Sequence, residues 1–210
     1  MAIEQVEQES TFKASAQLVD EDGVSLAGSE LEALVLEVVE SRTGAIARSK
    51  RDAYNANDVT IASSGQITWL GQVEDTQILN TDTRLGGLEN HDAVFEFAFG
   101  TPVDGTGTDL IATTAGDNTV TITLVGHGLN GSDIDEEHCF IVAAEEVGGL
   151  NLNGRWRIIT VPDGDTFTLE HTCTASATDA GGGGAVSVWL NPRVGIETIT
   201  FAVRRNRRDC

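Results

Sequence analysis

The sequence predicts an all-β protein, a β-sandwich with a second small β domain inserted into its last hairpin. Gly is frequent, with 23 of 210 residues, Pro is rare, with three, and Thr and Val recur in short runs. Clusters of Asp, Asn, Ser and Gly separate these runs and are typical of turns. No stretch approaches the ~20 consecutive apolar residues of a membrane-spanning helix, and the acidic first residues, MAIEQVEQES, are unlike a signal peptide. We therefore expect synthesis in the cytoplasm and no membrane partner.

Before residue 100, short alternating runs predict half-buried strands at 11–19, 59–62, 66–70 and 91–99. The run 91–99 is the clearest, because Phe95, Phe97 and Phe99 would share one face. We expect this row of phenylalanines and Trp69 to lie in a sandwich core.

Residues 31–39, LEALVLEVV, fit two structures. Ser29 and Glu32 would form a helical capping box. Leu34, Leu36 and Val38 would instead share one face of a strand. Because the neighbouring segments are predicted strands, we expect a strand here.

The second half of the chain begins with residues 101–118, which are small, polar and rich in turn formers, as in a crossing between domains. Further strands are predicted at 119–124, 139–144, 155–161, 166–170 and 185–190. Residues 162–165, Pro-Asp-Gly-Asp, predict a hairpin turn between two of them, and the four glycines at 181–184 predict a flexible connector.

The last predicted strand, 195–204, alternates in the same way as the run 91–99 and places Ile199, Phe201 and Val203 on one face. The two strands match as partners of a hairpin whose turn has been replaced by a long insertion. Because insertions are best tolerated where two chain ends lie close together, we predict a discontinuous sandwich domain of 1–105 and 191–210. The inserted domain would then be 106–190.

Charge is distributed unevenly along the chain. Asp and Glu outnumber Lys and Arg by 33 to 13, for a net charge of −20, which argues against direct contact with DNA. Candidate interaction residues are the N-terminal acids and the basic C-terminus: Glu4, Glu7, Glu9, Arg204, Arg205, Arg207, Arg208 and Cys210. This asymmetry suits head-to-tail contact between copies or docking of the basic tail on an acidic neighbour, and a solvated tail is the alternative.

No catalytic, cofactor-binding or metal-binding pattern is predicted. His127 has no G-x-S-x-G nucleophile elbow to serve and is expected at a turn or domain rim, and the acids before His138 lack EF-hand or zinc spacing. Three cysteines exclude a disulfide framework. We expect reduced thiols, and a late Cys139–Cys173 bond or an intermolecular bond through Cys210 stays open.

Two groups of segments resemble bacteriophage structural proteins. FKASAQLVDEDGVSLAGSELEALVLEVVE, SRTGAIARSKRDAYNANDVTIASSGQITW and HDAVFEFAFG resemble small virion proteins encoded among the head and tail genes of tailed phages. VTITLVGHGLNGSD and GGLNLNGRWRIITVPDGDTFTLE resemble a module of phage tail and fibre proteins, similar to the small β-barrel of ubiquitin-activating enzymes.

The resemblance implies an immunoglobulin-like β-sandwich with a small β-barrel-like domain inserted in a terminal hairpin. It also implies a non-enzymatic structural protein of the virion, located at the head-tail neck, the tail or the fibre attachment. The implied partners are other head, neck or tail subunits and copies of the chain itself. A capsid decoration protein is one alternative. A glycan-binding surface module is another, although three Trp and one Tyr offer few aromatic platforms.

Overall fold

The computed structural model describes residues 4–8, 10–20, 22–54, 56–79, 88–99, 105–132, 134 and 138–204. Strands dominate these residues, and their helical elements are two short 3-10 turns, η1 (Gly28–Glu30) and η2 (Val73–Thr76), which confirms the all-β class. The chain divides into two compact units, Met1–Phe97 with Gly195–Cys210, and Ala98–Val194. That the sandwich (1–105 with 191–210) and the insertion (106–190) fold as independent domains stays a prediction.

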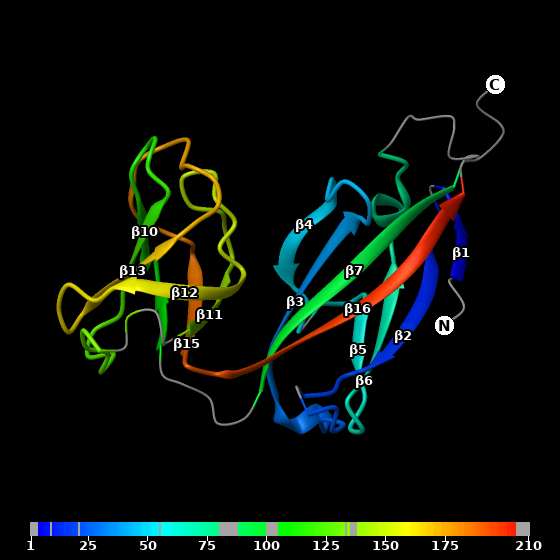
Figure 1. Cartoon of the computed structure of the whole chain (residues 1–210), viewed down its shortest axis with the longest axis horizontal. Helices are drawn as coiled ribbons and strands as arrows, with labels where there is room; N and C mark the ends of the chain where they lie inside the picture. The colour runs from blue at the N-terminus through cyan, green and yellow to red at the C-terminus, as the bar shows by residue number, and fades with distance from the viewer. Residues whose placement is uncertain are drawn as a thin grey trace. The chain divides into compact units, whose positions relative to one another are not determined.

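The first unit contains two sheets (Figure 1). One has the order β1 (Glu4–Glu7), β16 (Arg193–Arg204), β7 (Leu88–Phe99), β3 (Leu31–Glu40) and β4 (Ile46–Asp52). The other has the order β2 (Phe12–Gln17), β6 (Gln66–Gly71) and β5 (Val59–Ile61). β1 is added in parallel beside β16, at the edge of the first sheet.

The ambiguous segment 31–39 is the strand β3, as predicted, and the helical alternative is wrong. Glu30, rather than Glu32, makes the local cap, because its carboxylate accepts the N–H of Ala27 at 2.8 Å and closes the turn η1. β3 lies between β7 and β4, and Leu34 and Leu36 are completely buried. Burial in the middle of a sheet thus outweighs the helical propensity of this segment.

β7 and β16 are neighbours in the sheet, and three contacts between them fix their direction: Asp92 with Thr200, Phe97 with Gly195, and Phe99 with Arg193. The Thr200 hydroxyl donates to the Asp92 carboxylate at 2.7 Å. Residue numbers rise along one strand as they fall along the other, so the two strands run antiparallel, as predicted and as Figure 1 shows.

The core of the sandwich is aromatic. Trp69 on β6 is completely buried, and its ring centroid lies 5.1 Å from that of Phe12, 5.7 Å from Phe201 and 6.1 Å from Phe95. These rings come from both sheets and meet edge to face or tilted, the arrangements that aromatic pairs prefer. The predicted core of Trp69 and the phenylalanine row is therefore confirmed.

The second unit is a sheet of eight strands in the order β14-β9-β10-β13-β12-β11-β15-β8. Their bounds are β8 (Gly105–Thr108), β9 (Ile111–Thr113), β10 (Thr119–Thr123), β11 (His138–Ala143), β12 (Gly154–Thr160), β13 (Thr166–Glu170), β14 (Asp179–Gly182) and β15 (Ala185–Leu190). β8 continues into β9, and β14 continues into β15. Ala185 on β15 pairs with Thr108 on β8, and Gly182 on β14 pairs with Ile111 on β9 in the same register. The sheet therefore closes on itself as a barrel.

The barrel corners differ from two sequence predictions. Residues 101–118, predicted as a crossing, contain the wall strands β8 and β9, and the predicted glycine connector forms a wall corner. At that corner Gly183 has φ +101°, and a Cβ there would lie 2.8 Å from Val186 Cγ2 and 3.0 Å from Ile111 Cδ1. Glycine is required by the tight bend of the wall rather than by flexibility.

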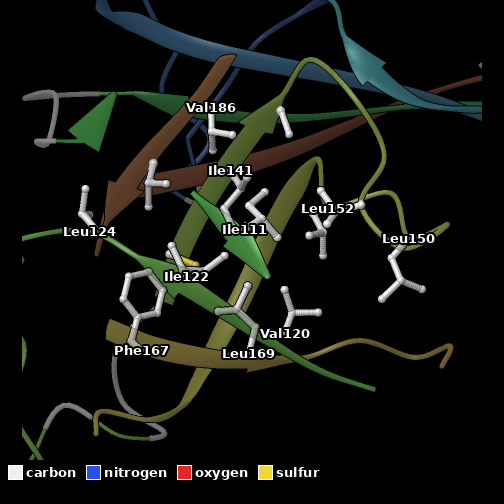
Figure 2. Packing of buried hydrophobic residues seen from close by; sticks show 14 of the residues in the cluster. Ile111, Val120, Ile122, Leu124, Ile141, Leu150, Leu152, Phe167, Leu169 and Val186 are labelled. Carbon is white, nitrogen blue, oxygen red and sulfur yellow. The ribbon is translucent and has the colours of Figure 1, made fainter. Parts of the chain in front are cut away.

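Apolar side chains fill the barrel (Figure 2). Ile111, Ile122, Ile141, Phe167 and Val186 come from five different strands, point into the same interior and are almost completely buried. This core belongs wholly to the second unit, as an independently folding insertion would require.

Gly65 in the turn between β5 and β6 should tolerate no side chain. Its φ is +77°, and a Cβ would lie 1.7 Å from the carbonyl oxygen of Leu26. Gly23 has the same φ with nothing within 4 Å, so Gly23→Ala is the matched control. We expect Gly23→Ala to cost ~1 kcal/mol of unfolding free energy from backbone strain. Gly65→Ala should cost a further ~1–3 kcal/mol in denaturant titrations, and equal costs would contradict the clash.

Candidate functional site

Three of the predicted interaction residues, Glu4, Glu7 and Arg204, lie at the end of the sandwich where β16 finishes. Glu4 and Glu7 belong to β1, and Glu7 is the register partner of Arg204 on β16. The backbone N–H of Gln8 also donates to the carbonyl of Arg204 at 2.8 Å. The structure therefore brings an N-terminal acid beside a C-terminal arginine within one chain. Glu9, Arg205, Arg207, Arg208 and Cys210 lie outside the described residues, so docking between copies stays a prediction.

A buried polar cluster, which the sequence analysis missed, lies under residues 72–79. His91 on β7 is completely buried, with its Nε2 2.7 Å from Glu89 Oε1 and its Nδ1 3.0 Å from the carbonyl oxygen of Asp75. The N–H of Leu79 donates to the same Glu89 oxygen at 2.9 Å. Glu89 and His91 thus attach the segment after η2 to the sandwich. Odd-numbered residues of β7, such as Phe95, face the core, and Glu89 and His91 have odd numbers too. This alternation is the sequence signal that could have revealed them.

Asp75 extends this cluster toward β4. Its carboxylate accepts the N–H of Gln72 at 2.7 Å and pairs with Arg48 Nη1 at 3.2 Å. Burial raises the pKa of Asp75 above its ordinary value, although the Gln72 hydrogen bond and Arg48 oppose that rise. Because the carboxylate bonds both its own turn, which follows β6, and a side chain of the edge strand β4, it links the two sheets.

A surface groove lies beside this junction, lined by Ala47, Arg48, Ser49, Asn57, Asp58, Leu70, Gln72 and Glu74. Arg48 Nη1 lies 3.5 Å from Asp58 Oδ2, and Arg51 Nη2 also bonds that oxygen. Burial lowers the pKa of Arg51, and the like charge of Arg48 acts in the same direction. Leu70 in the groove is 47% exposed, and Ile46 and Val73, adjacent in sequence to lining residues, are 56% and 41% exposed.

Lys50 on β4 links charged residues of three neighbouring strands. Its Nζ pairs with Glu96 Oε1 on β7 at 2.6 Å. Burial raises the pKa of Glu37 on β3, Lys50 opposes that rise and Glu96 adds to it. The ordinary pKa of a glutamate is 4.5, and above that pH the charged Glu37 carboxylate therefore destabilises the folded state.

Glu37→Gln should raise the free energy of unfolding at pH 7. An acid with a raised folded pKa destabilises the fold above that pKa, and the effect disappears below the unfolded value. The gain should be under ~1 kcal/mol, because Glu37 is only half-buried and solvent screens its charge. In thermal melts the gain should vanish below pH 4.

Glu40, on the same strand, is the control with the opposite expected effect. Burial would raise its pKa, but hydrogen bonds from Thr43 and Arg42 outweigh burial and lower it, so Glu40→Gln should destabilise at pH 7. A destabilised Glu37→Gln protein would contradict this account.

His127 and His171, the two barrel histidines whose side chains are described, have structural contacts. His127 Nδ1 accepts the N–H of Leu129 at 3.0 Å, and its ring meets Phe167 at 90° with 5.5 Å between centroids, so it caps a local turn as one of the two predicted roles requires. His171 packs against Trp156 at 5.1 Å and accepts the N–H of Cys173 at 2.9 Å.

Two of the three cysteines are described, and both are free thiols. Cys139 is buried, and burial raises the pKa of its thiol, whereas Cys173 is exposed. The alternative Cys139–Cys173 disulfide is therefore absent. Within the described ranges, three or more His, Cys, Asp or Glu side chains do not gather into a group that could hold a metal ion. The same part of the chain has no helix of a length and apolarity suited to crossing a membrane.

Comparisons with known proteins give little beyond this geometry. Neither a protein-family model nor a curated protein matches the chain. Among solved structures, the chain is similar to the phage phi92 endosialidase, with 13% identity and a TM-score of 0.35 over 90% of this chain. The matched part spans 31% of the endosialidase chain. A TM-score of this size supports no inference about function.

Proposed function

We propose that this chain is a non-enzymatic structural protein of a tailed-phage particle, at the head-tail neck, the tail or the fibre attachment. The observation that carries the proposal is the layout of the sandwich. The end of β16 and the neighbouring β1 lie at one end, beside the start of β7. The end of β7 and the start of β16, which lead to the second unit, lie at the other end (Figure 1).

This layout suits a building block. An insertion in the hairpin of β7 and β16 leaves the opposite end, where β1 lies beside the end of β16, free for contact with neighbouring subunits. The resemblance of both units to phage structural modules supports the same conclusion. Incorporation through the terminal end would bring the chain into the virion after its synthesis in the host cytoplasm.

The use of the polar side chains supports a non-enzymatic role. The carboxylates of Asp75 and Glu89 each accept a backbone N–H, and that of Asp58 pairs with the side chain of an arginine of the same unit. These carboxylates therefore stabilise the sandwich. The groove beside β4 exposes the apolar side chain of Leu70 among charged residues, which favours a protein partner. The partners we propose are other virion subunits and further copies of the chain.

Deleting residues 205–210 should separate folding from assembly. Arg204 must stay, because its backbone pairs with β1. The truncated protein is expected to keep its melting temperature and to be missing from particles assembled in cells that express it instead of the full chain. A full-length variant with Arg205, Arg207 and Arg208 changed to Ala is the matched control for loss of charge alone. Normal incorporation of the truncated protein would contradict docking through the C-terminus.

A further inference from the structure

Both ring nitrogens of His91 face hydrogen-bond acceptors. Nδ1 lies 3.0 Å from the Asp75 backbone carbonyl oxygen, an atom that can only accept. Nδ1 must therefore carry a proton. Nε2 lies 2.7 Å from Glu89 Oε1, and that oxygen already accepts the N–H of Leu79 at 2.9 Å.

A neutral pair does not fit this arrangement. If His91 were neutral with its proton on Nδ1, a lone pair on Nε2 would face the lone pairs of Glu89 Oε1 at 2.7 Å. The ring is completely buried, so water cannot separate the two atoms. A protonated Glu89 would reverse the bond, but Oε1 would then be a poorer acceptor for Leu79. An imidazolium facing a carboxylate satisfies all three hydrogen bonds.

We propose that His91 is held as an imidazolium by Glu89, and that this buried pair is a pH-sensitive latch that keeps residues 75–79 on the sandwich. Because the pair contacts the carbonyl of Asp75 and the N–H of Leu79, it attaches both ends of the segment. Loss of the shared proton would leave two acceptors in contact and release the Leu79 end first.

The charges around the pair are compatible with this latch. From η2, the Asp75 carboxylate is bonded to the Gln72 N–H and to Arg48 of β4. From β16, the uncharged ring of Phe201 lies 5.5 Å from the His91 ring. Thr76, also from η2, bonds the uncharged backbone of Ser10. Among the described residues, Glu89 is therefore the carboxylate that bonds the imidazolium directly.

The direction of the pH effect follows from linkage. The latch holds only while the imidazole of His91 is charged and Glu89 is ionised. Its stability is therefore lost as the pH rises and Nε2 gives up its proton, and it is also lost in acid, where Glu89 becomes protonated.

NMR of protein labelled with ¹⁵N-histidine tests the proposal, with His91 assigned by its loss in His91→Gln. At pH 7 both nitrogens of His91 should carry protons. As the pH rises and Nε2 loses its proton, the Leu79 amide should exchange with solvent about tenfold faster, after correction for intrinsic exchange. The Leu26 amide, bonded to the Leu18 carbonyl at 3.0 Å in the same unit, should not change.

Glu89→Gln supplies the second test. Without a carboxylate, His91 should become a neutral tautomer at pH 7 with its proton on Nδ1, and Leu79 exchange should lose its pH dependence. A neutral His91 in the unmodified chain at pH 7 would overturn the proposal. So would proton loss without faster exchange at Leu79, or retention of the proton until the whole sandwich unfolds.

Discussion

Replacing Trp69 with alanine is expected to remove ~3–5 kcal/mol from the free energy of unfolding of the sandwich. The indole is completely buried among the rings of Phe12, Phe95 and Phe201, so truncation leaves a large cavity between the two sheets. Denaturant titration followed by NMR signals of the first unit measures this loss without interference from the barrel.

Leu70→Ala is the matched control for Trp69→Ala. Leu70 is the next residue on the same strand and is 47% exposed, so its truncation should cost under ~1 kcal/mol. Similar losses for the two variants would show that the aromatic cluster does not form the centre of the core.

Replacing residues 100–192 with an Asn-Gly turn should remove the barrel and leave a folded sandwich. Phe99 and Arg193 face each other across β7 and β16, with the guanidinium carbon 4.5 Å from the ring centroid, so a two-residue turn spans the gap. The Trp69 core lies entirely in the first unit and loses none of its rings.

The NMR spectrum of the shortened chain should retain the dispersed signals of Trp69 and Phe201. Its matched control carries the same turn together with Trp69→Ala and should unfold at lower denaturant concentration. A shortened chain that is unfolded under native conditions would contradict the two-domain prediction.

The sandwich was the more predictable half of the fold. A half-buried strand such as β7 keeps a period of two over most of its length, because one face packs on the core and the other is more exposed. β3 was ambiguous because apolar residues occupy both of its faces, and only its position between β7 and β4 explains the strand. Pattern alone could not supply that position.

The barrel wall and the polar cluster were harder to predict. β8, Gly-Thr-Gly-Thr, and β14, Asp-Ala-Gly-Gly, have almost no apolar alternation, because they form the bent corners that close the sheet. Their sequences therefore resemble loops. Glu89 and His91 occupy inward positions of β7, but polar side chains there indicate burial only when their partners are known. Those partners, in residues 75–79, approach from a different part of the chain.

A quantitative protein inventory of purified virions tests the structural role most directly. If the proposed function holds, particles of the phage in question should contain the chain at a fixed copy number that survives washing in high salt. A small ring-sized number would support a neck, tail or fibre position, and hundreds of copies would indicate capsid decoration instead. Absence of the chain from intact particles, with the protein present in the infected cell, would contradict the proposed function.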